Sequence, residues 1–125
     1  MIALLGASAL TLVALQASIA APTSEFRGCL RSAADRATGQ KVSGDTIETY
    51  LRNACTVQMG GLRDALIAFR VKNGMSKKAA ADDAQMTIDD YVATPADNYR
   101  FIFEQNSPKP QAAAAPATPQ PTTPQ

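Results

Sequence analysis

The feature that most constrains this 125-residue chain is its single pair of cysteines, Cys29 and Cys55. Ten residues separate Cys29 from Gly39, and nine separate Thr46 from Cys55, on either side of the segment KVSGD. If both arms are helical, each is about 15 Å long, because an α-helix rises about 1.5 Å per residue. The spacing therefore predicts an antiparallel helical hairpin in which the two sulfur atoms lie level and form a disulfide.

A disulfide suits a chain of this size. A small domain has a limited core, so a covalent link adds useful stability. Closing a ring between Cys29 and Cys55 is expected to contribute about 3.5 kcal/mol by the loop-entropy relation. The alternative is two buried free thiols. A redox pair is disfavoured because the chain has no C-x-x-C motif.

The first twenty residues, MIALLGASALTLVALQASIA, predict a signal peptide over residues 1–20. They are uncharged and apolar, and they end in Ser18-Ile19-Ala20, a small-x-small cleavage sequence. They lack the basic residues that usually precede such a run. The alternative is a membrane anchor, since the run is just long enough to span a bilayer. We expect a periplasmic or secreted protein, bound to a membrane only if residues 1–20 are retained.

The other end of the chain predicts a disordered tail over residues 107–125. Its sequence, SPKPQAAAAPATPQPTTPQ, contains one charged residue and no large apolar side chain. Nothing in it offsets the entropy lost on ordering, and its prolines favour an extended conformation. A recognition arm for a proline-binding partner is the alternative. The folded domain is therefore expected over residues 21–106.

Between these ends the hydrophobic pattern predicts an all-α fold. Apolar residues recur at steps of three and four, and no stretch shows the alternation of a β-strand. We expect a disulfide-linked antiparallel hairpin of helices at about 24–38 and 46–73, followed by one or two C-terminal helices. The third helix would begin at Ser76, and the pattern restarts at Thr94-Pro95 to give a short fourth.

Local signals mark the expected helix ends. Capping side chains are expected at the beginnings, and glycine at the ends. The signals are Ser24 with Glu25, Gly39, Asp45 or Thr46 (with Glu48 three residues after Asp45, in capping-box position), Asn73-Gly74, and Ser76.

Gly60 and Gly61 lie inside the second expected helix, where each costs up to about 1 kcal/mol relative to alanine. They indicate a bend or the close approach of another helix. A site where a ligand approaches the backbone is the alternative.

The segment NGMSKKAA resembles the turn of a helix-turn-helix DNA-binding protein over these few residues only. Arg70 stands four positions before the turn glycine, where two closely crossing helices need a small residue. The second helix would also carry Asp82, Asp83, Asp89 and Asp90, which phosphates repel. We expect no nucleic-acid partner.

Charge is divided unevenly along the chain. Residues 26–78 hold ten basic and four acidic residues, whereas residues 79–105 hold Arg100 and six acidic residues. One interpretation is that the acidic helix packs beside the basic hairpin. The other is a basic face that binds an acidic protein or an anionic envelope component. The residues of this possible face are Arg27, Arg31, Arg52, Arg63, Arg70, Lys72, Lys77 and Lys78.

The chemistry in the sequence argues against catalysis. The chain contains no histidine, the commonest general base and zinc ligand. The Asp82-Asp83 and Asp89-Asp90 pairs lie on a helix, which cannot wrap a cation as a loop does. We expect no metal or cofactor, and a non-catalytic binding or structural module. A membrane-associated helical protein is the alternative. A carboxylate enzyme would need a deep pocket lined by at least two of Glu25, Glu48 and Asp64.

Overall fold

A computed structural model describes the backbone of residues 8–108 and the side chains from Ser18 to Pro108. Residues 1–7 of the predicted signal peptide and residues 109–125 of the predicted tail lie outside the described residues. Within them every regular element is a helix, so the all-α prediction is confirmed. The helices are α1 (Ser8–Gln40), α2 (Ile47–Ala54), α3 (Thr56–Lys72) and α4 (Lys77–Asn106).

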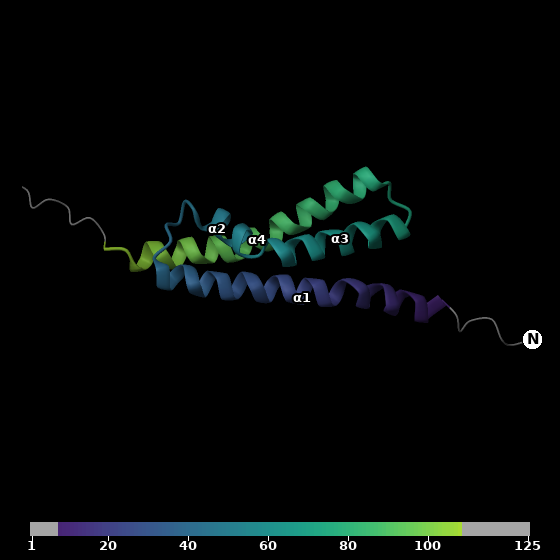
Figure 1. The fold of residues 1–125 in the computed structure, drawn as a ribbon, viewed down its shortest axis with the longest axis horizontal. Helices are drawn as coiled ribbons and strands as arrows, with labels where there is room; N and C mark the ends of the chain where they lie inside the picture. Colours follow the sequence, from purple (N-terminus) through teal and green to yellow (C-terminus); the bar gives the residue numbers. More distant parts are fainter. Residues whose placement is uncertain (1–7, 109–125) are drawn as a thin grey trace, which may run out of the picture.

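Figure 1 shows how the four helices are arranged. The longest, α1, forms a rod, and α2 and α3 run back along it in the opposite direction. The chain then reverses again, so that α4 runs in the direction of α1. α4 contacts all three other helices and completes the bundle.

One hydrophobic core joins the helices. Its α4 residues recur at steps of three or four, which places them on one face of that helix. The ring of Phe26 in α1 meets the ring of Tyr91 in α4 edge-to-face, with their centroids 6.4 Å apart. The buried residues are Phe26, Leu30, Ala33, Ala37, Ile47, Leu51, Cys55, Leu62, Leu66, Ala84, Ile88, Val92, Ala96 and Tyr99.

The disulfide between Cys29 and Cys55 is present, as the spacing predicted. The two Cα atoms are 5.9 Å apart, and the sulfur atoms are bonded at 2.07 Å. Cys55 is fully buried in the core, while Cys29 is half-buried at its edge. The alternative of two free thiols is wrong.

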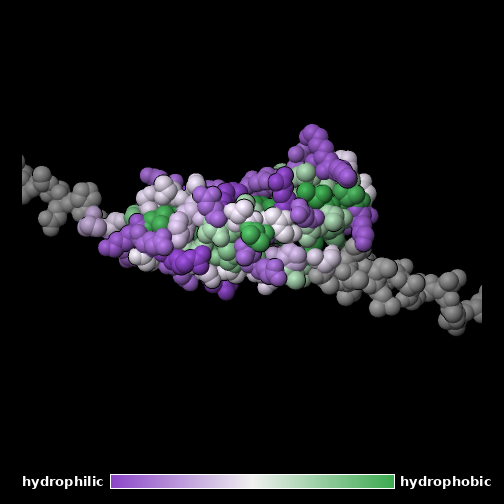
Figure 2. Space-filling model, viewed as in Figure 1, coloured by the Kyte–Doolittle hydropathy of each residue, from purple (hydrophilic) through white to green (hydrophobic). Residues whose placement is uncertain are grey.

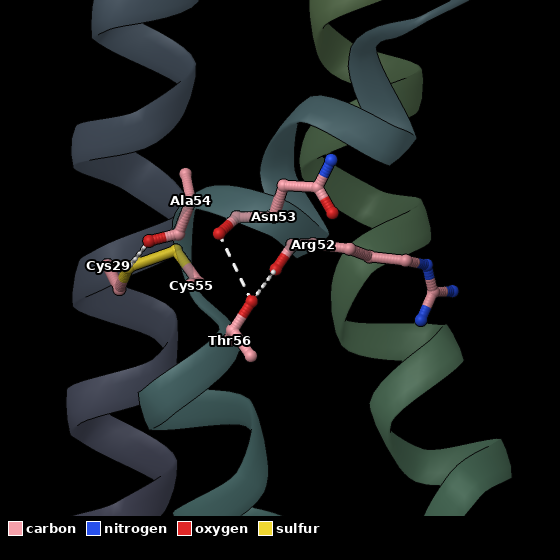
Figure 3. Close-up of a disulfide and its surroundings, with 6 residues drawn as sticks. All are labelled: Cys29, Arg52, Asn53, Ala54, Cys55 and Thr56. Atoms are coloured by element: carbon pink, nitrogen blue, oxygen red, sulfur yellow. Dashed lines mark hydrogen bonds between the residues drawn. A yellow bond between two sulfur atoms is a disulfide. The ribbon is translucent and has the colours of Figure 1, made fainter.

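The second predicted helix, 46–73, is in fact two helices that are interrupted at Cys55. This residue has φ −117° and ψ 25°, outside the helical range. Beside it, the hydroxyl of Thr56 donates to the carbonyl oxygens of Arg52 and Asn53, at 3.2 and 3.1 Å (Figure 3). The side chain thus satisfies carbonyls at the end of α2 that the interrupted backbone leaves available.

The sulfur of Cys29 lies 3.7 Å from the carbonyl oxygen of Ala54, the last residue of α2 (Figure 3). A disulfide sulfur carries no proton, so this is a close contact and not a donated hydrogen bond. The covalent bond and this contact together hold α1 against the break between α2 and α3.

The first helix begins earlier than the 24–38 predicted, because α1 continues back to Ser8. Ser24 and Glu25 therefore lie inside it and do not cap it. Pro22 also lies inside α1, although proline has no N–H to donate to the preceding turn. The hydroxyl of Thr23 donates to the carbonyl of Ile19 at 2.7 Å in the same region.

The far end of α1 differs from the predicted stop at Gly39. The helix ends at Gln40, and the left-handed residue that follows is Lys41, with φ 54°. The N–H of Val42 reaches back to the carbonyl of Ala37 at 3.0 Å, which closes the helix end as a Schellman motif.

The predicted capping box of α2 is also absent. Thr46 is the N-cap residue but makes no capping hydrogen bond through its side chain. Glu48 binds arginine instead, since its carboxylate lies 3.0 Å from Arg52 and 3.7 Å from Arg100. A carboxylate held by two guanidinium groups is not available to close the first turn.

The turn between α3 and α4 follows the prediction. Gly74 adopts φ +94°, and the N–H of Met75 bonds to the carbonyl of Arg70 at 3.0 Å. Ser76 then caps α4, its hydroxyl oxygen accepting from the N–H of Ala79 at 3.2 Å. Figure 1 shows α3 and α4 as an antiparallel pair.

The restart predicted at Thr94-Pro95 does not occur, because α4 runs unbroken through Pro95. Buried residues on both sides of the proline lie on the same face, and Val92 and Ala96 are fully buried. Tyr99 anchors the second half of α4. Its hydroxyl donates to the carbonyl oxygen of Val42 at 2.6 Å and also lies 3.2 Å from the carbonyl oxygen of Ala37. Burial of this face outweighs the local signal of the proline.

Gly60 and Gly61 lie within α3. A β-carbon added at either position would meet no atom within 4 Å. No other helix in the described structure therefore makes the close approach that was one interpretation of these glycines.

Replacing Tyr99 with phenylalanine is expected to lower the free energy of unfolding at neutral pH by about 1–1.5 kcal/mol, because the carbonyl of Val42 loses its donor. Burial and the nearby Tyr50 raise the pKa of Tyr99 above its ordinary value. The native state therefore holds the phenolic proton more tightly than the unfolded chain. This stability is fully present below about pH 10 and is lost as the pH rises further.

Urea unfolding at several pH values measures both effects. The Tyr99→Phe variant should lose less stability than the parent between neutral pH and alkaline pH. Tyr91→Phe is the control, because its hydroxyl makes no hydrogen bond within the described residues, and it should change stability by less than about 0.5 kcal/mol. Equal effects of the two variants would contradict the role of Tyr99.

Replacing both cysteines with alanine is expected to lower the free energy of unfolding by about 3.5 kcal/mol, through the loss of the ring between Cys29 and Cys55. Adding a reductant to the unaltered protein should have a similar effect, measured by urea unfolding. A loss below about 1 kcal/mol would show that the bond is not needed to hold α1 against the rest of the bundle.

Candidate functional site

The structure divides the eight predicted basic residues into two groups. Three have a carboxylate partner within the chain, and five have none among the described residues. The paired residues are Arg52, Arg70 and Lys78; the others are Arg27, Arg31, Arg63, Lys72 and Lys77.

Arg52 joins α2 to α4. One guanidinium nitrogen, Nη2, lies 3.0 Å from Glu48 and 2.8 Å from Asp89. Figure 3 shows this side chain reaching from α2 toward α4. Burial opposes its charge, but hydrogen bonds to Glu48 and Asp89 outweigh that effect and raise its pKa above the ordinary value.

Arg70 joins α3 to α4 in the same way. It forms an ion pair with Asp83, and its Nη2 donates to the hydroxyl of Thr87 at 3.1 Å. Its side chain is only 19% exposed, and its buried Nη1 has no partner among the described residues. The interpretation that the acidic helix packs beside the basic hairpin is therefore confirmed for Arg52 and Arg70.

The pair between Lys78 and Asp82 differs, because both residues lie on α4 and are largely exposed. Their charged atoms are 2.8 Å apart, and the side chains are 88% and 66% exposed. Such a pair contributes little to stability. It does raise the pKa of Lys78, chiefly through the hydrogen bond to Asp82.

Arg27 and Arg31 lie on the wall of a groove between α1 and the second half of α4. The groove has a volume of about 490 Å³. Both arginines are exposed and stand one turn apart on α1. The other polar residues of the groove are Asp35, Thr38, Thr94 and Asn98, and its apolar residues are Leu30, Ala34, Tyr91, Pro95, Tyr99 and Ile102.

A second depression of about 380 Å³ continues this groove toward the end of α4. The two depressions share Thr38, Tyr99 and Ile102. Ile102 remains 55% exposed in this shared region. The second depression is also lined by Lys41, Phe103, Asn106, Ser107 and Pro108. We call the two together the α1–α4 groove.

Sequence patterns placed Arg27 and Arg31 among basic residues but did not show what lies opposite them. Tyr91, Pro95 and Ile102 recur at steps of four and seven, which is a helical stripe. In the sequence this stripe is hard to see, because Thr94-Pro95 predicts a new helix and so separates Tyr91 from Ile102. The continuity of α4 is what aligns the stripe with α1.

Arg63, Lys72 and Lys77 do not line the α1–α4 groove. Lys72 and Lys77 flank the turn between α3 and α4, near two partly exposed apolar residues, Val71 at 36% and Met75 at 38%. Figure 2 shows hydrophobic residues gathered at the end of the molecule where α3 meets α4. The predicted basic residues therefore belong to at least two regions.

The carboxylates considered for catalysis lie outside the α1–α4 groove. Neither depression of the groove is lined by Glu25, Glu48 or Asp64. Over residues 8–108, no cluster of three or more potential acidic, cysteine or histidine ligands could hold a metal ion. No helix in the described part of the chain has the length and hydropathy needed to cross a bilayer.

Comparisons of the chain with protein-family models, with curated proteins and with solved structures find no match.

Replacing Asp83 with asparagine is expected to lower the free energy of unfolding by about 1–2 kcal/mol, because the largely buried guanidinium of Arg70 loses its counter-charge. Asp82→Asn is the control. It removes the exposed pair with Lys78 and should leave the free energy of unfolding almost unchanged. Thermal or urea unfolding measures both, and equal costs would show that the α3–α4 contact does not depend on this pair.

Proposed function

We propose that this chain is an exported, non-catalytic helical module, periplasmic or secreted, that binds an anionic partner through the α1–α4 groove. The observation that carries the proposal is that Arg27 and Arg31 remain unpaired. They line an apolar groove and have no carboxylate partner in the described structure, whereas Arg52 and Arg70 are neutralised by α4.

Two features support export. A disulfide that closes the core is characteristic of proteins that fold in an oxidising compartment. Residues 1–20 have the apolar run and the small residues of a cleavable leader.

The position of Pro22 supports cleavage after Ala20. Inside a long helix a proline costs about 3 kcal/mol, because it removes a hydrogen bond and crowds the preceding turn. If the mature chain begins at Ala21, Pro22 falls in the first turn of α1, where proline is favoured. Glu25 then lies close to the helix N-terminus, where a negative charge is stabilising.

The composition of the groove supports binding without catalysis. Asp35 is the only acid among its lining residues. The chain offers no histidine to act as a general base, and both cysteines are in the disulfide. An arginine is well suited to hold a carboxylate or phosphate, since its planar guanidinium can donate two parallel hydrogen bonds.

One observation favours the alternative, a membrane-associated protein that retains residues 1–20. α1 is continuous from Ser8, and Ile19 packs against the core. Retention of the leader would keep that contact.

Intact mass of the exported protein, measured with and without reductant, tests export and processing. The expected product begins at Ala21 and gains two hydrogens on reduction. A protein that keeps residues 1–20 would support the membrane-associated alternative. A product that gains no mass on reduction would contradict folding in an oxidising compartment.

Retention on immobilised polyglutamate tests the anionic partner. The double variant Arg27→Glu, Arg31→Glu should elute at lower salt than the parent, because the charges that meet the matrix are reversed. The double variant Arg36→Glu, Arg63→Glu is the charge-matched control, because both arginines are exposed, have no carboxylate partner among the described residues and line neither depression. Equal loss of retention in both variants would show that net charge, and not the groove, governs binding.

A further inference from the structure

We infer that the α1–α4 groove binds a single-chain anionic amphiphile, a molecule with one alkyl chain and a carboxylate or phosphate head. The alkyl chain would lie along the floor, and the head between Arg27 and Arg31. This inference rests on the proposed function, whose anionic partner it specifies by chemical class.

The size and lining of the groove suit an alkyl chain. Its two depressions, of about 490 and 380 Å³, each lie in the range of small-molecule sites. Their lining residues extend from Arg27 in α1 to Lys41 just beyond its end, and this part of the helix is about 20 Å long at 1.5 Å per residue. Ile102, which both depressions share, is more than half exposed and gains an apolar neighbour when the groove is filled.

The charged side chains of the groove set the position of the anionic head. Arg27 and Arg31 stand one turn apart on the same wall, so both guanidinium groups can reach one anionic head. Asp35 stands one turn further along that wall and repels an anion. The head is therefore held at the Arg27 end, and the chain runs toward Ile102. Across the groove, the side-chain amide of Asn98 offers an uncharged N–H donor, whereas the hydroxyl of Thr94 already donates to the carbonyl of Asp90 at 3.4 Å.

An alkyl chain fits this floor better than an extended peptide does. The floor is formed by side chains of two helices, whose backbone groups are already paired within each helix. A peptide strand laid on Leu30, Tyr91 and Ile102 would meet no free backbone groups of the two helices. Its N–H and C=O groups that face these apolar side chains would lose water without gaining a backbone partner, which is costly. An alkyl chain has no such groups.

Titration of the processed, disulfide-bonded protein with dodecyl phosphate, below its micellar concentration, tests the inference. NMR shift changes should map to Arg27, Arg31, Tyr91 and Ile102, and binding should weaken as salt is added. Neither inorganic phosphate, which has no chain, nor dodecyl maltoside, which has no charge, should bind there. Binding of inorganic phosphate at the same strength would show an anion site only.

Chain length and variants sharpen the test. Affinity should rise from octyl to dodecyl phosphate by up to about fourfold per methylene group that the groove covers. Arg27→Glu with Arg31→Glu should weaken dodecyl phosphate binding by about tenfold or more. Ile102→Ser should weaken it severalfold. The charge-matched control, Arg36→Glu with Arg63→Glu, should weaken it much less, and circular dichroism should show that every variant remains folded.

Three outcomes would overturn the inference: affinity that does not depend on chain length, shift changes elsewhere on the protein, or a larger loss from Lys41→Glu than from the double arginine variant. The last would place the head at the opposite end of the groove. If the protein is retained on polyglutamate through Arg27 and Arg31 but dodecyl phosphate does not bind, the proposed function stands and only the amphiphile is wrong.

Discussion

The disulfide between Cys29 and Cys55 is the constraint on which the rest of this structure depends. It joins the middle of α1 to the residue where α2 ends and α3 begins. That position sets the register of both short helices against the long one with a single bond. Because Cys55 is also buried in the core, the covalent link and the hydrophobic contacts stabilise the same arrangement. The bond thus reinforces a core that is small, as expected for a domain of this size.

α4 completes the bundle and also decides which charges remain available. Its acidic residues Asp83 and Asp89 neutralise Arg70 and Arg52, which face it from α3 and α2. On its other side α4 presents Tyr91, Thr94 and Ile102 to α1, and none of these can neutralise an arginine. Arg27 and Arg31 keep their charge available beside an apolar surface for this reason. Whether an arginine is paired within the chain or left without a carboxylate partner therefore depends on which face of α4 it meets.

The two prolines inside helices show how local preference and tertiary contacts compete. Pro95 lies within α4 because burial of Val92, Ala96 and Tyr99 on one face favours a continuous helix. Pro22 lies between two core residues of α1, Ile19 and Phe26. If the mature helix begins near Pro22, as we propose, that proline occupies the first turn and breaks no hydrogen bond within the helix.

The sequence by itself determined the helical class, the antiparallel hairpin, the cysteine pairing, and the turn at Gly74 and Ser76. These follow from short-range rules: periodicity, distance along a helix, and the conformations that glycine and serine favour at helix ends. Only the tertiary structure decided that the second helix breaks at Cys55, that α4 continues through Pro95, and that the eight basic residues separate into paired and unpaired groups. Those outcomes depend on which faces meet across the bundle. Contacts between residues far apart in the chain set the α1–α4 groove, and no local pattern encodes them.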